Sequence, residues 1–143
     1  MPYAKPARAL LGLALSLLAA CSAGIRVRED PEEVRTRYES YAGAPIDHFT
    51  WLGHYDGWEA LGADQLVLFT SANRAYLLKV SPPCHDLRTA ERVGFTSTGG
   101  AVYARLDSVT TRSWRCRILQ IRRVDYRRMK ADLRRAGTPA PAG

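Results

Sequence analysis

The sequence predicts one α+β domain, mainly β: a small antiparallel sheet, barrel- or sandwich-like, with an N-terminal and a C-terminal helix. About five to seven short apolar stretches, separated by turn residues, follow one another between residues 46 and 124. Apolar residues at helical spacing occur before and after that region. The 143 residues suit one domain, and 46% hydrophobic with 24% charged residues exclude a wholly disordered chain.

The first helix is predicted to open at Asp30, whose carboxylate can cap it, with Pro31 at the first helical position. Glu33 stands where a capping box places its carboxylate. Apolar side chains then recur at helical spacing: Val34, Tyr38 and Tyr41. Gly43 and Pro45 are expected to end this helix.

The central strands are predicted from two kinds of apolar pattern. From Ile46 the period changes to two, as in a half-buried strand, and Asp56-Gly57 offers a turn. The run 66–69 is continuously apolar and too short for a helix, so it indicates a strand in the middle of the sheet. A turn at 71–74 and alternation from 75 to 80 predict a hairpin with this run.

The second half of the chain predicts shorter strands. Residues 93–96 form a short strand, and Gly99-Gly100 is a turn from which 101–105 returns. The last strand runs from Trp114 to Val124. Two adjacent apolar residues, Ile118 and Leu119, break its alternation, which predicts a β-bulge or burial on both faces.

The closing helix is predicted to begin at Asp125, which can cap it. Its apolar stripe consists of Tyr126, Met129 and Leu133. Gly137 ends it, and residues 137–143 are expected to form a disordered tail.

Residues 1–20 are predicted to be a signal peptide. Lys5 and Arg8 form a positively charged start without acidic residues, and the run 9–18 is apolar. The run is too short for a membrane-spanning helix, which needs roughly 20 apolar residues. Export from the cytoplasm argues against nucleic acid as the partner of this basic chain.

The end of the signal peptide looks like a bacterial lipobox, Leu18-Ala19-Ala20-Cys21. In lipoproteins of that kind the cysteine thiol receives a diacylglycerol, so the membrane would hold the chain through its N-terminal lipid. Ser22 favours the outer membrane, with the protein on its periplasmic face. An ordinary signal peptide that happens to contain a cysteine is the alternative. Residues 21–29 would form a tether, and 30–136 one disulfide-bridged globular domain.

Two cysteines remain once Cys21 is lipidated. An even pair in an oxidising compartment predicts a disulfide between Cys84 and Cys116. Two free thiols or a metal-bound pair are the alternatives, and zinc is poorly supported because neither cysteine has a Cys-x-x-Cys partner. We expect no cofactor.

The middle of the chain also resembles a known family. The resemblance is carried, in order, by the stretches 58–62, 66–70, 75–78, 84–87, 95–97, 106–109, 116–118 and 121–125. Together they resemble a family of short, uncharacterised proteobacterial lipoproteins, classed as a domain of unknown function, over roughly residues 46–130. That family usually has an Arg-Pro-Asn-type turn where this chain has Ser71-Ala72-Asn73. The resemblance implies the envelope localisation and the disulfide, and implies no catalytic residue.

The cluster that most resembles a catalytic site is His85-Asp86, beside Cys84. A histidine held by a carboxylate could act as a general base. The alternative is a polar loop after a disulfide, in which Asp86 caps the following turn. The sequence places no third catalytic group, so we predict no enzyme and no catalytic residue.

Two further patterns could form binding sites. His48 and His54 would lie about 20 Å apart on a strand, too far to share a metal ion, so no metal site is predicted. Three aromatic residues could line a groove for a sugar or peptide, although such residues more often belong to the core: Trp51, Tyr55 and Trp58.

The positive charge is concentrated near the C-terminus. The formal net charge is +7, of which the signal peptide carries two. Residues 21–121 are balanced, so the remaining excess lies in 122–135. This predicted basic surface comprises Arg122, Arg123, Arg127, Arg128, Lys130, Arg134 and Arg135.

A basic helix beside a lipid anchor can contact anionic lipid, peptidoglycan or an acidic envelope protein. A merely solvated helix face is the alternative. The sequence therefore predicts an interaction or structural lipoprotein of the cell envelope. The alternative function is a periplasmic hydrolase or small-ligand-binding protein that uses His85 and Asp86 or the aromatic groove.

Overall fold

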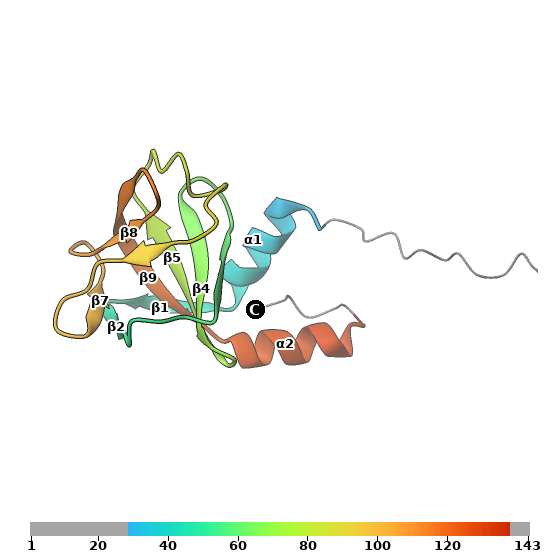
Figure 1. The fold of residues 1–143 in the computed structure, drawn as a ribbon. Coiled ribbons are helices and arrows are strands. Elements are labelled where there is room, and N and C mark those ends of the chain that lie inside the picture. The colour runs from blue at the N-terminus through green and yellow to red at the C-terminus, as the bar shows by residue number, and fades with distance from the viewer. Residues whose placement is uncertain (1–28, 138–143) are drawn as a thin grey trace, which may run out of the picture.

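The computed structural model describes residues 29–137 (Figure 1). The predicted signal peptide, the lipidation site Cys21, and the tether before Glu29 lie outside the described residues, as does the predicted tail beyond Gly137. The elements are α1 (Pro31–Ser40), β1 (Ala42–Ile46), β2 (His48–Thr50), β3 (Gly57–Ala60), β4 (Gln65–Ser71), β5 (Arg74–Val80), β6 (Gly94–Phe95), β7 (Ala101–Tyr103), β8 (Ser108–Thr110), β9 (Arg115–Val124) and α2 (Tyr126–Arg135).

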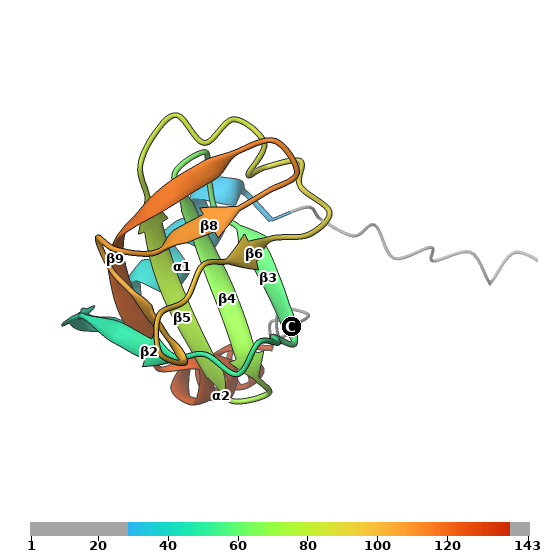
Figure 2. The ribbon, with the colours of Figure 1, turned by 60° about the vertical axis from the view of Figure 1, so that its left-hand side comes forward.

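The strands form a curled antiparallel sheet that closes about half of a barrel (Figures 1 and 2). Its order is β3-β4-β5-β9-β8-β6, and β1 also pairs with β9. The long strand β9 makes this possible, because residues 115–117 pair with β8 and 121–124 pair with β1. β2 and β7 form a separate two-stranded sheet. The prediction of a mainly β, antiparallel, barrel-like domain is confirmed.

The middle of the sheet is buried on both faces, which explains the unbroken apolar run in β4. Leu66 and Leu68 point into the concave side and join the larger core. Val67 and Phe69 point to the outer side, where both helices cover the sheet (Figure 2). A strand that is covered on both faces does not need a polar residue at every second position.

Helix α1 begins as the sequence predicts. Asp30 accepts a 2.9 Å hydrogen bond from the Glu32 backbone N–H, and Pro31 is the first helical residue. Tyr38 is its one fully buried side chain and lies against Phe69. The expectation of an N-terminal helix needs correction, because α1 starts only at residue 31 of the chain.

Helix α2 follows β9 directly. The Asp125 carboxylate accepts a 3.1 Å hydrogen bond from the Arg128 N–H, as expected of the predicted cap. Tyr126 and Met129 are buried against the outer face of the sheet. Neither described helix is long and apolar enough to cross a membrane.

The predicted irregularity in β9 is a β-bulge. Val80 pairs with Ile118 and Lys79 pairs with Gln120, so Leu119 has no partner in β5. Leu119 is 40% exposed, whereas Ile118 is fully buried. The extra residue lets Ile118 and Ile121, three positions apart, share the concave core.

Two strand assignments differ from the sequence-based expectation. Residues 42–46, expected to end a helix, form edge strand β1, where Pro45 is tolerated. The Gly99-Gly100 turn exists, with both φ angles positive, but β7 pairs with β2 and β6 pairs with β8. The predicted hairpin is reduced to a single bridge between Thr98 and Ala101.

Candidate functional site

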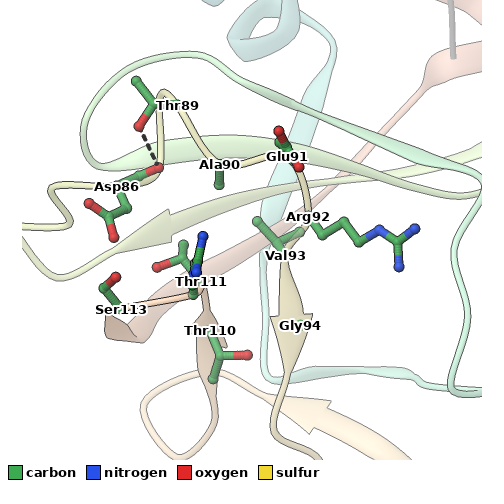
Figure 3. A pocket seen from close by; sticks show the side chains of 11 residues that line it. Asp86, Thr89, Ala90, Glu91, Arg92, Val93, Gly94, Thr110, Thr111 and Ser113 are labelled. Atoms are coloured by element: carbon green, nitrogen blue, oxygen red, sulfur yellow. Dashed lines mark hydrogen bonds between the residues drawn. The ribbon is translucent and has the colours of Figure 1, made fainter.

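A polar pocket lies between the loop 86–94 and the turn that joins β8 to β9 (Figure 3). Its volume is about 630 Å³, within the usual range of about 300–1,000 Å³ for ligand sites. Figure 3 shows Asp86 on one wall, with Thr111 and Ser113 across from it. The lining residues are Asp86, Thr89, Ala90, Glu91, Arg92, Val93, Gly94, Thr110, Thr111, Arg112 and Ser113.

The predicted disulfide joins the two segments that carry the walls of this pocket. Cys84 and Cys116 are bonded, with 5.8 Å between their Cα atoms, and both are buried. Cys84 precedes the loop that forms one wall, and Cys116 pairs with Val109 of β8 beside the other. The bond therefore fixes the loop against the sheet.

The candidate pair His85 and Asp86 does not form a hydrogen-bonded dyad. No hydrogen bond joins the two side chains anywhere in residues 29–137. His85 instead lies against the Trp114 ring, with 4.8 Å between ring centroids, while Asp86 lines the pocket. Asp86 also does not cap the next turn with its carboxylate, since Thr89 bonds to its backbone oxygen.

The other two histidines lie apart from each other. The His48 ring packs 4.9 Å from Tyr103, and His54 lies within hydrogen-bonding distance of the Leu52 carbonyl oxygen. The part of the chain that the structure describes contains no group of three or more histidine, cysteine or acidic residues placed to hold a metal ion.

The aromatic residues considered for a groove pack against the concave core. Trp51 lies over Phe95 at 5.1 Å and stacks on Tyr55 at 6.3 Å. The Tyr55 hydroxyl donates a 2.9 Å hydrogen bond to the Val93 carbonyl. Trp58 is likewise half-buried against this core. These rings help to close the open side of the half-barrel.

The seven residues of the predicted basic surface do not share one environment. Arg122 donates 2.7 Å hydrogen bonds to the carbonyls of Ala42 and Gly43, so it fastens β1 beside β9. Lys130 donates to the Ala72 carbonyl at 2.7 Å, which ties α2 to the β4–β5 turn. Both cations are thus occupied by backbone oxygens.

Two more of the seven cations share one carboxylate. Asp132 pairs with Arg128 at 3.8 Å and, more closely, with Arg135. The Tyr41 hydroxyl donates a 2.8 Å hydrogen bond to the same carboxylate, and this bond together with Arg135 holds the pKa of Asp132 below its usual range. Asp132 therefore offsets part of the positive charge on α2.

Three arginines remain exposed, and no ion pair within residues 29–137 engages them: Arg123, Arg127 and Arg134. Arg127 and Arg134 are seven residues apart on α2, which is two helical turns and hence one side of the helix. Arg123 lies near the end of β9, just before the helix. These three form the free part of the basic segment.

Sequence reasoning missed a half-buried carboxyl group between α1 and β3. The Tyr38 hydroxyl donates a 3.4 Å hydrogen bond to Glu59, and burial raises the pKa of the Glu59 carboxyl. Burial also raises the pKa of the Tyr38 hydroxyl strongly. The only sequence signal was a glutamate inside an otherwise apolar strand.

The comparisons with known proteins supply a family and no activity. No curated protein matches the chain, and no solved structure matches it. The model of a family of unknown function (DUF6491) matches residues 4–139, nearly the whole sequence. The chain therefore belongs to this family of unknown function (DUF6491).

Proposed function

We propose that this protein is a non-catalytic interaction module of the bacterial cell envelope that presents a basic surface to an acidic one. The observation that carries the proposal is that three exposed arginines of the basic segment 122–135 make no ion pair within the described residues: Arg123, Arg127 and Arg134. The other four cations of the segment 122–135 hold the fold together or pair with Asp132: Arg122, Lys130, Arg128 and Arg135.

The proposed anchor is a lipid on Cys21, at the periplasmic face of the outer membrane. Residues 22–29, fully extended, would reach roughly 26–29 Å from it. The first turn of α1 and the last turn of α2 point to the same end of the domain (Figure 1). An anchor that precedes α1 would therefore bring Arg134 near the membrane surface.

The expected binding free energy suits a surface contact that adds to the hold of a lipid anchor. A cation near an anionic membrane surface contributes about 1 kcal/mol, so three contribute on the order of 3 kcal/mol. That is too weak for lasting attachment, which the lipid would supply. Salt should weaken the contact, because exposed charges are screened over about 10 Å at 0.1 M ionic strength.

A hydrolase would need a histidine activated by a neighbouring group. The contacts of His85 run to Trp114 and not to Asp86, so they do not support that alternative. No nucleic acid partner is proposed, since the export signal would keep the chain out of the cytoplasm.

The test is co-sedimentation of the non-lipidated Cys21→Ser chain with vesicles of phosphatidylcholine, with and without phosphatidylglycerol. We expect binding only to the anionic vesicles at low salt and loss of binding at high salt. The triple variant Arg123→Gln, Arg127→Gln, Arg134→Gln should bind about a hundredfold more weakly.

A matched control replaces three exposed arginines elsewhere: Arg88, Arg115 and Arg117. This triple glutamine variant should bind the anionic vesicles like the unchanged chain. Equal losses in both triple variants, or no binding at low salt to vesicles or to isolated peptidoglycan sacculi, would overturn the proposal. Retention on sacculi alone would identify the cell wall as the acidic surface.

A further inference from the structure

We propose that the pocket beside the disulfide binds an uncharged saccharide. The loop 86–94 and the β8–β9 turn place four charged side chains around it: Asp86, Glu91, Arg92 and Arg112. No ion pair joins any two of them in the described part of the chain. All four therefore line the pocket without an ion pair among them.

The charge of the pocket favours a neutral ligand. Two acidic and two basic side chains line the pocket, so their formal charges cancel. The most buried of the four charged residues is Asp86, which is half-buried, whereas Glu91, Arg92 and Arg112 are exposed. A half-buried carboxylate in the pocket lining disfavours a phosphate or another anion, because like charges repel more strongly where less water screens them.

The hydrogen-bonding groups match a ligand that both donates and accepts. Ionised Asp86 only accepts, and Arg112 only donates. The hydroxyls of Thr110 and Ser113 can do both. Each sugar hydroxyl also donates and accepts, so adjacent hydroxyls can bond to Asp86 and to a donor at once. Hydrogen bonds to these charged groups are stronger than those between neutral groups.

Two aromatic residues adjoin the pocket lining in the sequence, and they favour a sugar as the ligand. Trp114 follows Ser113, and His85 precedes Asp86; their rings lie 4.8 Å apart. Trp114 is 42% exposed, so part of its ring surface is open to solvent. The C–H face of a pyranose ring packs well on such a surface, while its hydroxyls reach the polar groups beside it.

The frame of the pocket is held in place before a ligand binds. The Cys84–Cys116 disulfide joins its two walls. In its lining, a Cβ atom on Gly94 would meet the Thr110 hydroxyl oxygen at 2.6 Å, so a larger residue at 94 would force the Thr110 side chain to move. Because the loop is already fixed, less conformational entropy is lost when a ligand binds, and a larger part of the interaction energy contributes to the affinity.

The test is an NMR titration of the non-lipidated Cys21→Ser chain with N,N′-diacetylchitobiose and with maltose. We expect saturable shifts of backbone amides in 86–94 and 110–114, together with a change in Trp114 fluorescence. Asp86→Asn and Ser113→Ala should each weaken binding, Asp86→Asn at least tenfold. Asp47→Asn is the matched control, since this exposed carboxylate lies outside the pocket and should leave binding unchanged.

Absence of shifts with both saccharides would overturn the proposal. So would equal affinity of Asp86→Asn and Asp47→Asn, or binding of the zwitterion glycylglycine in place of the saccharides. The amide spectrum of β4 and β5 reports whether each variant is folded, and Ser113→Ala, a surface change, keeps the test valid if Asp86→Asn does not fold. The Asp86→Asn chain should still bind anionic vesicles, which separates this site from the proposed basic surface.

Discussion

The buried carboxylate of Asp107 accepts a 2.8 Å hydrogen bond from the hydroxyl of Thr96, which lies eleven residues earlier in the chain. Its other oxygen accepts a 2.9 Å bond from the Tyr103 backbone N–H. The Thr96 oxygen in turn accepts a 2.8 Å bond from the Ser108 N–H. At 3% exposure, Asp107 is one of two buried polar residues in the described core, and it organises the connection from β6 through β7 to β8.

Replacement of Asp107 should therefore destabilise the fold. In Asp107→Asn one acceptor oxygen becomes an NH₂ group facing a donor, and we expect a loss of about 1–3 kcal/mol. Urea unfolding followed by circular dichroism measures it. Asp47→Asn, whose carboxylate is 87% exposed, should change stability by less than about 0.5 kcal/mol. A loss as small in Asp107→Asn as in that control would contradict the assigned role.

Removal of the disulfide should cost more. The Cys84–Cys116 bond closes a loop with a sequence separation of 32, for which the chain-entropy model gives about 3.7 kcal/mol. The double variant Cys84→Ser, Cys116→Ser should lose an amount of that order in the free energy of unfolding. A reducing agent should lower the free energy of unfolding of the unchanged chain by the same amount and leave the double variant unaffected. A response of the double variant to the reducing agent would contradict the role assigned to this disulfide.

Helix α2 should contribute to stability mainly through its inward face. Met129 is fully buried among the residues of the outer core, so Met129→Ala should cost about 2–5 kcal/mol. Arg127→Ala on the exposed side should cost less than about 0.5 kcal/mol. Thermal and urea unfolding of both variants compare the two faces. Similar losses would mean that α2 does not pack on the sheet as described.

Glu59 should make stability depend on pH. Burial raises the pKa of its carboxyl above the ordinary 4.5, so the folded state holds the proton more tightly than the unfolded state. The stabilisation is complete below pH 4.5 and is lost as the pH rises through the folded-state pKa. Glu59→Gln cannot ionise, and its amide oxygen can still accept from Tyr38.

The Glu59→Gln variant should thus gain stability relative to the unchanged chain as the pH increases from 4.5 towards 7. Urea unfolding at several pH values measures this difference. Glu91→Gln, which alters an exposed carboxylate, is the control and should show no such trend. A constant difference across this pH range for Glu59→Gln would be incompatible with the burial of its carboxyl group.

Features that depend on neighbouring residues were predictable from the sequence. The β4–β5 hairpin forms around the expected turn at 71–74, and Asp30 and Asp125 cap the two helices. The bulge at Leu119 was visible as a broken alternation. The pairing of Cys84 with Cys116 followed from their even number in a chain that is predicted to be exported. Each of these rests on local geometry or on counting.

Features that depend on distant partners were not predictable. The sequence around Gly99-Gly100 specifies a turn but not which strand lies beside β7, and that choice is made by β2, some fifty residues earlier. Likewise the sequence predicts that Arg122 is a surface cation. In the structure it bonds to the carbonyls of residues 42 and 43, which belong to the start of the domain. The pocket escapes prediction for the same reason, since its walls come from separate segments.

The bulge at Leu119 also determines where the disulfide can form. Cys116 and Ile121 are five positions apart, so in a regular strand their side chains would point to opposite faces. With one extra residue between them, both face the concave core. A deletion of Leu119 would turn the first residues of β9 over and aim the Cys116 thiol at the outer face, away from Cys84. The single unpaired residue Leu119 thus determines on which side of the sheet the Cys84–Cys116 disulfide lies.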